Sequence, residues 1–248
     1  MKKLILLLIT ACVAQLCMAQ SVSNERKLRA PLWTYHSINT DIIGLSVGLV
    51  PESVKEVSGT SKTFGVRLEA DPISVLYFMF YNRYDIAEDL EEFGQIMSAP
   101  VAQKSYGLNI SSGNIANIDT YGISVTALIQ KTRLNNGISF AGGGNIVEKS
   151  NGIIMGLGNM SFVSNGMSLS LISNSSKVSN GIQITGISND SKVLKGIQIG
   201  GSNSISSQGL GLQIGIFNKA TNFRGIQLGL WNKNDKRSLP ILNWNFKN

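Results

Sequence analysis

The stretch "GIQLGLWNKN", Gly225 to Asn234, decides the fold because the same phrase recurs upstream at a nearly constant interval. "GLQIGIFNKA" begins at Gly211 and "GIQIGGSNSI" at Gly196, which gives spacings of fourteen and fifteen residues. Glycines that precede an apolar residue continue the register upstream: Gly107, Gly122, Gly137, Gly152, Gly166 and Gly181. A fixed period of this kind predicts a repeat architecture. We therefore expect nine copies of one unit, filling residues 106–234.

Within a copy, apolar and polar residues alternate. Ile182 and Ile184 alternate with Gln183 and Thr185, a pattern typical of a half-buried strand. We expect the isoleucines to face the interior and Gln183 to face solvent. An Asn follows each strand at Asn174, Asn189, Asn203, Asn218 and Asn232. These residues are expected either to stack as an amide ladder or simply to close a turn.

Two architectures accommodate such strands. In a parallel β-solenoid every copy is one coil with the same surroundings, so a fifteen-residue rule follows. In an antiparallel barrel the natural unit is a hairpin of about thirty residues, and the sequence shows no such superperiod. We predict an all-β fold, a parallel β-solenoid of about nine 15-residue coils. The alternative is an antiparallel transmembrane β-barrel, because Leu242, Trp244 and Phe246 resemble the terminal strand of outer-membrane barrels.

The first residues predict export. Residues 1–19 combine two lysines, an apolar run and a small-residue exit, as secretory signal peptides do, with cleavage expected between Ala19 and Gln20. Alternatively, "ITAC" fits a lipoprotein signal in which Cys12 would be lipidated. Cys12 and Cys17 are the only cysteines, so the processed repeat region would hold no disulfide. The expected location is the outer membrane or cell surface.

The segments that flank the repeats are less regular. Residues 20–105 are expected to form an irregular N-terminal β region, in which "GLSVGLV" from Gly44 matches the phrase out of register. This region also contains one short amphipathic helix within "YDIAEDLEEFGQIM", packed on the core, with Ile86 and Phe93 at helical spacing. Residues 235–248 are expected to cap the last coil with the aromatic rings of Trp244 and Phe246.

Residues suited to chemistry are sparse. His36 is the only histidine, which argues against a multi-histidine metal site. Asp119, Glu148 and Asp190 are the only acids between Gly107 and Asn234, and they stand far apart in the repeat register. We therefore expect no catalytic, cofactor-binding or metal-binding residue, no cofactor, and no enzyme activity.

The charge balance points away from nucleic acid. The formal net charge is +7 at pH 7, and loss of Lys2 and Lys3 with the signal would lower it to +5. The remaining cations are scattered, and no nucleic-acid motif or aromatic interleaving accompanies them. We expect no nucleic-acid partner, whereas membrane association remains possible. The oligomeric state stays open.

The copies "NGIQITGISN", "KGIQIGGSN" and "RGIQLGLWNKNDKRSLPILNWNF" resemble a family of bacterial surface-repeat proteins. Those proteins are built from fifteen-residue units of the form NG-h-Q-h-G-h-h-N, where h is apolar. The resemblance spans Gly107 to Phe246, although the copies from Gly107 to Gly166 carry Ser, Asn or Ile where Gln is usual. It implies a surface location and supplies no catalytic residues.

The predicted function follows from the repeats and this resemblance. We expect a non-catalytic exported surface protein that acts as a scaffold, coat or adhesin-like binding surface. Its outward rows of Gln, Ser, Asn and Lys would contact an unknown extended surface ligand or the cell envelope. The alternative function, matching the alternative fold, is a small outer-membrane pore.

Overall fold

The computed structural model describes residues 25–34, 37–48, 59–71, 74, 86–115 and 118–246. The predicted signal segment with Cys12 and Cys17 lies outside the described residues, as do His36 and most of the apolar run that follows Asp71.

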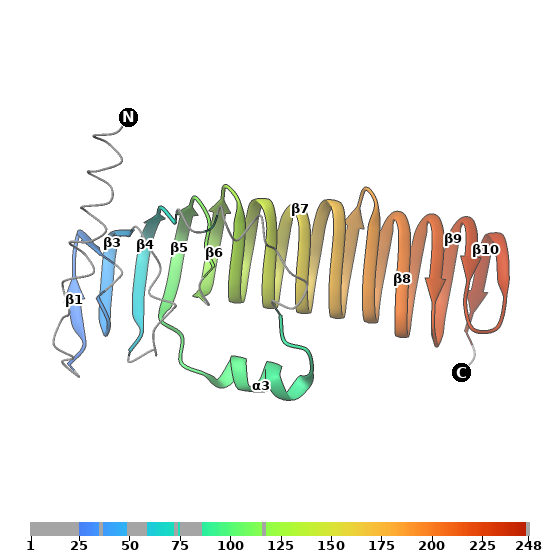
Figure 1. The fold of residues 1–248 in the computed structure, drawn as a ribbon, viewed down its shortest axis with the longest axis horizontal. Coiled ribbons are helices and arrows are strands. Elements are labelled where there is room, and N and C mark those ends of the chain that lie inside the picture. The colour runs from blue at the N-terminus through green and yellow to red at the C-terminus, as the bar shows by residue number, and fades with distance from the viewer. Residues whose placement is uncertain are drawn as a thin grey trace.

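The described chain is a long parallel β-solenoid (Figure 1). Its elements in order are β1 (Lys27–Arg29), β2 (Leu32–Thr34), β3 (Thr40–Gly48), β4 (Ser61–Glu69), α3 (Leu90–Ser98), β5 (Gln103–Ser111), β6 (Ile118–Thr126), β7 (Ile129–Thr185), β8 (Ser188–Ala220), β9 (Phe223–Lys233) and β10 (Ser238–Asn245). β7 and β8 are unbroken because the ladder hydrogen bonds continue through the corners as the chain winds. Ile182 pairs in parallel with Ile197, fifteen residues later. This pairing confirms the predicted solenoid and excludes the antiparallel barrel.

The array begins earlier than the sequence suggested. Gly44 pairs with Gly65, and Gly65 pairs with Gly107, so the upstream copies are in register after all. Eleven glycines occupy this one column: Gly44, Gly65, Gly107, Gly122, Gly137, Gly152, Gly166, Gly181, Gly196, Gly211 and Gly225. The expected count of about nine coils is therefore too low. Long connections between the first coils, including α3, hide the period without breaking the stack.

The column glycine resets the side-chain alternation in each coil. Leu194 is buried and Lys195 exposed before Gly196, whereas Ile197 points outward and Gln198 is buried after it. Gly196 has φ of +150°, and a Cβ atom there would lie 1.9 Å from the carbonyl oxygen of Gly181 in the coil before. Only glycine permits both this backbone conformation and this approach. The column glycine therefore places outward side chains on both sides of itself.

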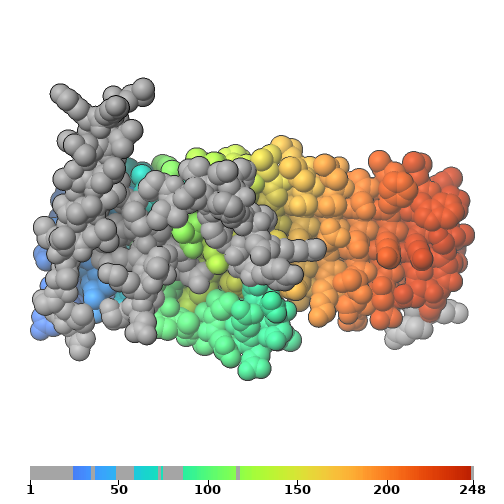
Figure 2. Space-filling model, viewed as in Figure 1, coloured from blue at the N-terminus to red at the C-terminus, as the bar shows by residue number. Residues whose placement is uncertain are grey.

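Chain order equals position along the molecule. The colours of the coils in Figure 2 run in sequence along the long axis. The order of strands in the sheet follows the chain, so each coil pairs only with its neighbours. The helix α3 lies beneath one long edge (Figure 1). Asp89 caps its first turn by accepting a hydrogen bond from the Glu92 amide, and Phe93 stacks on Phe162 with ring centroids 4.5 Å apart. The predicted helix is present, although Ile86 precedes it and is buried against the coils.

The C-terminal end is closed by a strand that runs the other way. β10 pairs antiparallel with β9, so that Asn243 lies opposite Gln227 and Trp244 opposite Ile226. The sequence predicted that aromatic rings would cover the end of the last coil. That prediction is wrong, because Trp244 and Phe246 are both exposed. β10 covers the edge of β9 and is itself the last strand of the sheet. It is short, contains Pro240 and has a register shift between Leu239 and Ile241, features that make an edge strand a poor template for pairing.

Candidate functional site

The interior of the solenoid is polar along the strand that follows each column glycine. Gln227, Gln213, Gln198 and Gln183 lie one above another, each at most 1 % exposed. The amide nitrogens of Gln227, Gln213 and Gln198 each donate to the oxygen of the glutamine in the preceding coil, at 2.7, 2.8 and 2.8 Å. Gln183, the first of the row, donates to Ser176 at 3.0 Å. Asn243 of β10 continues this ladder by donating to Gln227 at 3.1 Å. A fully bonded polar row can occupy a dry interior because no amide is left unpaired.

A second ladder follows the upper corner, where each coil turns back. Its members are Asn145, Asn159, Asn174, Asn189, Asn203, Asn218 and Asn232, joined by amide hydrogen bonds of 2.7 to 2.9 Å. Each nitrogen from Asn145 to Asn218 also donates to a backbone carbonyl, as Asn189 does to Ile199 at 2.9 Å. Of the two roles that the sequence left open for these residues, the structure therefore shows the amide ladder. The Asn ladder donates toward the C-terminus and the Gln ladder toward the N-terminus, so their dipoles oppose each other.

The predicted orientation of the strands is wrong. Gln183 is 1 % exposed, whereas Ile184 is 36 % exposed. Alternation correctly grouped the residues that share a side, but the apolar group faces out. The interior also contains apolar clusters, such as Leu194, Ile205, Ala220 and Phe223.

The outward positions of this strand form a continuous apolar face. We define the apolar face as the residues one and three positions after each column glycine. The first row is Leu45, Val66, Leu108, Ile123, Ile138, Ile153, Met167, Ile182, Ile197, Leu212 and Ile226; the second is Val47, Leu68, Ile110, Val125, Phe140, Met155, Leu169, Ile184, Ile199, Ile214 and Leu228. All are at least partly exposed. Leu242 and Trp244 of β10 extend the face by one strand.

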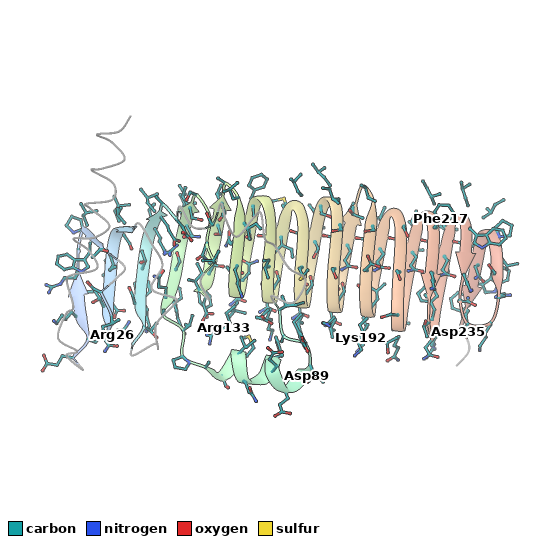
Figure 3. The ribbon with its side chains drawn as sticks, viewed as in Figure 1. Arg26, Asp89, Arg133, Lys192, Phe217 and Asp235 are labelled. Carbon is teal, nitrogen blue, oxygen red and sulfur yellow. The ribbon has the colours of Figure 1, made fainter. Side chains whose placement is uncertain are left out.

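The two long edges differ in chemistry (Figure 3). Phe217 projects from the upper edge, whereas Arg133, Lys192 and Asp235 lie along the lower edge. Other exposed apolar side chains precede the Asn ladder at the same corner as Phe217: Leu157, Leu171, Ile172, Ile187, Ile216, Leu230 and Trp231. The apolar face therefore continues around the upper edge.

The opposite side is hydrophilic in the C-terminal half. We define the polar face as the outward residues of the returning strand: Ser175, Lys177, Asp190, Lys192, Ser204, Ser206, Lys219, Thr221 and Lys233. A shallow hollow of about 530 Å³ lies on this face beside Ile86 and Glu88, lined mainly by serines, Lys177, Asp190 and Lys192. Small hydroxyls and two cations offer hydrogen bonds but no evident nucleophile–base pair.

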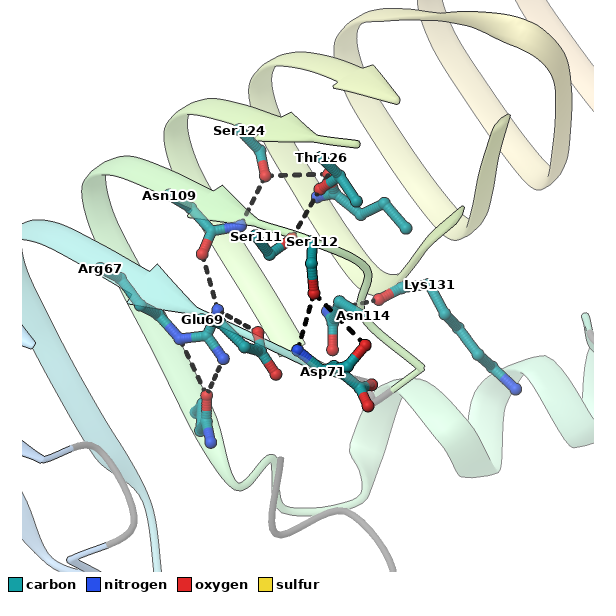
Figure 4. Close-up of polar contacts among 12 residues, drawn as sticks. Arg67, Glu69, Asp71, Asn109, Ser111, Ser112, Asn114, Ser124, Thr126 and Lys131 are labelled. Atoms are coloured by element: carbon teal, nitrogen blue, oxygen red, sulfur yellow. Dashed lines mark hydrogen bonds and ion pairs between the residues drawn. The ribbon is translucent and has the colours of Figure 1, made fainter. Parts of the chain in front are cut away.

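In the first coils other polar residues, one of them charged, occupy the position of the glutamines (Figure 4). Arg67 occupies the Gln row at 1 % exposure and lies 2.7 Å from Glu69. It also donates to Asn109 at 2.6 Å, and Asn109 donates to Ser124 at 2.7 Å. This cluster continues the polar row and lies inside the coils, so its role is structural.

The three acids of the repeat region are used separately. Asp119 accepts a two-pronged ion pair from Arg133, at 2.8 and 2.6 Å. Glu148 is buried, and its carboxylate accepts the Ala87 amide at 3.2 Å. Burial raises the pKa of Glu148 above its ordinary value, more than that hydrogen bond lowers it. Asp190 lines the hollow on the polar face.

Other titratable groups contribute little chemistry. The hydrogen bond from Arg26 lowers the pKa of Asp41, and burial raises the pKa of Tyr121. Within the described ranges, no three His, Cys, Asp or Glu side chains are grouped as a metal ion would require. Three triplets match the acceptor pattern for N-glycosylation: "NMS" at Asn159, "NSS" at Asn174 and "NDS" at Asn189. The side-chain amides of these asparagines are buried in the Asn ladder, so they cannot accept a glycan in the folded chain.

No family model matches the sequence, and no curated protein and no solved structure matches it either. Among the residues that the structure describes, no helix has the length and hydrophobicity needed to cross a membrane.

Proposed function

We propose that the chain is a non-catalytic, exported scaffold of the bacterial envelope, and that its apolar face is the surface that binds. The single observation that carries this proposal is the repetition of two outward apolar positions in eleven consecutive coils. The predicted signal peptide and the resemblance to bacterial surface-repeat proteins support the location. The outward Gln rows suggested by the sequence are buried, so they cannot form the binding surface.

The size of the apolar face argues for a partner. Eleven coils spaced about 4.8 Å apart give a strip roughly 50 Å long, and two rows make it about 10 Å wide. Its area of roughly 500 Å² already equals the largest apolar patch of a typical soluble monomer, and the upper edge adds to it. A sequence that merely tolerated exposed apolar residues would interrupt these rows with polar ones, and no row is interrupted.

Photo-crosslinking in intact cells tests this function. A photoreactive phenylalanine analogue replaces Ile184 on the apolar face or, in a matched control, Ser206 on the polar face. We expect the analogue at position 184 to form adducts with envelope components after illumination and the analogue at position 206 to form few. This readout does not depend on whether the chain is also attached through Cys12.

Two results would contradict the proposal. Adducts that form at position 206 but not at 184 would move the binding surface to the polar face. Cell fractionation that finds the processed chain free in the cytoplasm would remove the envelope role altogether.

A further inference from the structure

We infer that the apolar face binds the surface of an anionic lipid bilayer, with the solenoid lying flat on the membrane rather than crossing it. This inference rests on the proposed function and names the partner of the same face. The apolar strip, the charges beside it and the aromatic residues at its C-terminal end carry the argument.

The charge beside the apolar strip has one sign. Residues 191–246 contain seven cations and one acid, Asp235. Three of these cations, Lys192, Lys219 and Lys233, lie on the polar face, whereas Lys195 and Arg224 stand immediately before column glycines. Lys195 and Arg224 are exposed directly beside the column glycines, next to the apolar rows. Asp235 lies on the lower edge, where its carboxylate accepts a hydrogen bond from the backbone N–H of Asn222. Cations that flank an apolar surface match anionic headgroups above acyl chains.

The same charges argue against a second copy as the partner. In the described coils, none of the outward positions immediately before, one after or three after a column glycine is occupied by Asp or Glu. An identical face would therefore offer Lys195 and Arg224 no carboxylate. Two apolar faces packed together would bury or crowd these cations, which is costly without partners.

Aromatic residues gather where the cations are. Phe217, Trp231, Trp244 and Phe246 are all exposed at the C-terminal end of the apolar face and upper edge. The Arg237 guanidinium lies 4.6 Å from the Trp244 ring centroid. Indole rings favour the boundary between headgroups and acyl chains. We therefore expect the C-terminal coils to make the strongest contact with the bilayer.

Tryptophan quenching by brominated lipids tests which side faces the membrane. The first full-length chain carries Trp33→Phe and keeps Trp231 and Trp244. The second carries Trp33→Phe, Trp231→Phe and Trp244→Phe together with Lys192→Trp on the polar face, where it meets the lower edge. Both keep the same N-terminal segment, so its own affinity for lipid is common to both. Vesicles contain phosphatidylglycerol and phosphatidylcholine with brominated acyl chains.

We expect the emission of the first chain to fall by about two-fold or more, because face-down binding would insert Trp231 and Trp244 to a depth of about 5–10 Å. The emission of the second chain should change little. The pair Lys195→Gln and Arg224→Gln should lower partitioning into these vesicles by about 25-fold, since each cation near an anionic surface contributes about five-fold. The matched pair Lys177→Gln and Lys192→Gln on the far side should lower it by less than about two-fold, because salt screens charges beyond about 10 Å.

Equal quenching of the two chains, or no quenching of the first, would overturn the lipid inference. If crosslinking from position 184 still captured an envelope protein, the proposed function would stand and only the lipid partner would be wrong. A dimer in sedimentation that dissociates with Ile184→Lys would identify a second copy as the occupant and would likewise overturn the inference.

Discussion

The Gln198 side chain is bonded to neighbours on both sides inside the solenoid. Its nitrogen donates to Gln183 at 2.8 Å, and its oxygen accepts from Gln213 at 2.8 Å. Burial of an amide is unfavourable unless such bonds are made. The ladder therefore works only as a row, and one substitution affects two adjacent coils.

Gln198→Ala should lower the free energy of unfolding by about 2–4 kcal/mol, because it removes the shorter of two hydrogen bonds donated by Gln213, removes one donor to Gln183 and opens a gap. The matched control Ile184→Thr, on the exposed apolar face, should cost less than about 1 kcal/mol. Urea unfolding followed by far-ultraviolet circular dichroism measures both. A larger loss of unfolding free energy for Ile184→Thr than for Gln198→Ala would show that the apolar rows, and not the glutamines, are buried.

The orientation of the strand could not be read from alternation alone. A period of two groups Ile182 with Ile184 and Gln183 with Thr185, but it does not say which group faces inward. In most half-buried strands the apolar group faces the core, which is why the sequence pattern predicts the opposite orientation. The available signal was constancy: Gln recurs unchanged at one position in four copies, whereas its apolar neighbours vary among Ile and Leu. A row of stacked amides needs the same side chain in each coil, whereas an exposed apolar row can exchange Ile for Leu.

Gly196→Ala should be severely destabilising, by more than about 3 kcal/mol, because the new Cβ atom would lie 1.9 Å from the Gly181 oxygen at a φ of +150°. Gly94→Ala is the matched control. Nothing lies within 4 Å of a Cβ atom at Gly94 in α3, so alanine there should stabilise by about 0.5–1 kcal/mol. Thermal unfolding of the two variants decides between them. Similar effects would mean that the glycine column is not structurally required.

At the scale of elements, the segment before α3 is docked on the coils through Glu148. The buried carboxylate accepts the Ala87 amide, and Ile86 packs against Ile129, Ile146 and Met160. The sequence predicted the helix because its apolar spacing is local. The docking partner was not predictable, because Glu148 is 61 residues from Ala87 in the chain and a lone acid in a strand gives no sign of its contact.

The raised pKa of Glu148 predicts a pH dependence. Burial raises this pKa above its ordinary value of 4.5, so the folded chain binds a proton more readily than the unfolded chain. Stability from this group is therefore complete below pH 4.5 and is lost as pH rises through the folded pKa. Glu148→Gln should remove that loss and stabilise the chain at neutral pH relative to wild type. Unfolding midpoints between pH 4 and pH 8 test this; a variant that parallels wild type across the range would contradict it.

At the scale of the whole molecule, the sequence predicted the stack but not its extent. Fourteen- and fifteen-residue spacing gave the parallel register from Gly107 to Gly225, since only parallel coils reproduce one environment per copy. The sequence placed the copy at Gly44 out of register and outside the array, because residues 70–102, with α3, separate Gly65 from its neighbour Gly107. A stack tolerates such an insertion at a corner, because each coil is stabilised by its neighbours rather than by chain continuity.

The closing strand predicts how the molecule ends. β10 covers the last parallel coil by antiparallel pairing, and Asn243 accounts for the final bond of the Gln ladder. Deletion of residues 238–248 should therefore replace the short, irregular edge strand β10 by the longer edge of β9, and long regular edges recruit other chains. Because coils couple only to neighbours, the remaining array should stay folded, with unchanged circular dichroism per residue apart from the last coil. Sedimentation velocity should then show concentration-dependent self-association that the full chain lacks, while Asn243→Ala, which keeps the strand pairing, should not. A truncated chain that sediments as the full chain does, or one that loses its strand signal throughout, would show that β10 does not act as a local end cap.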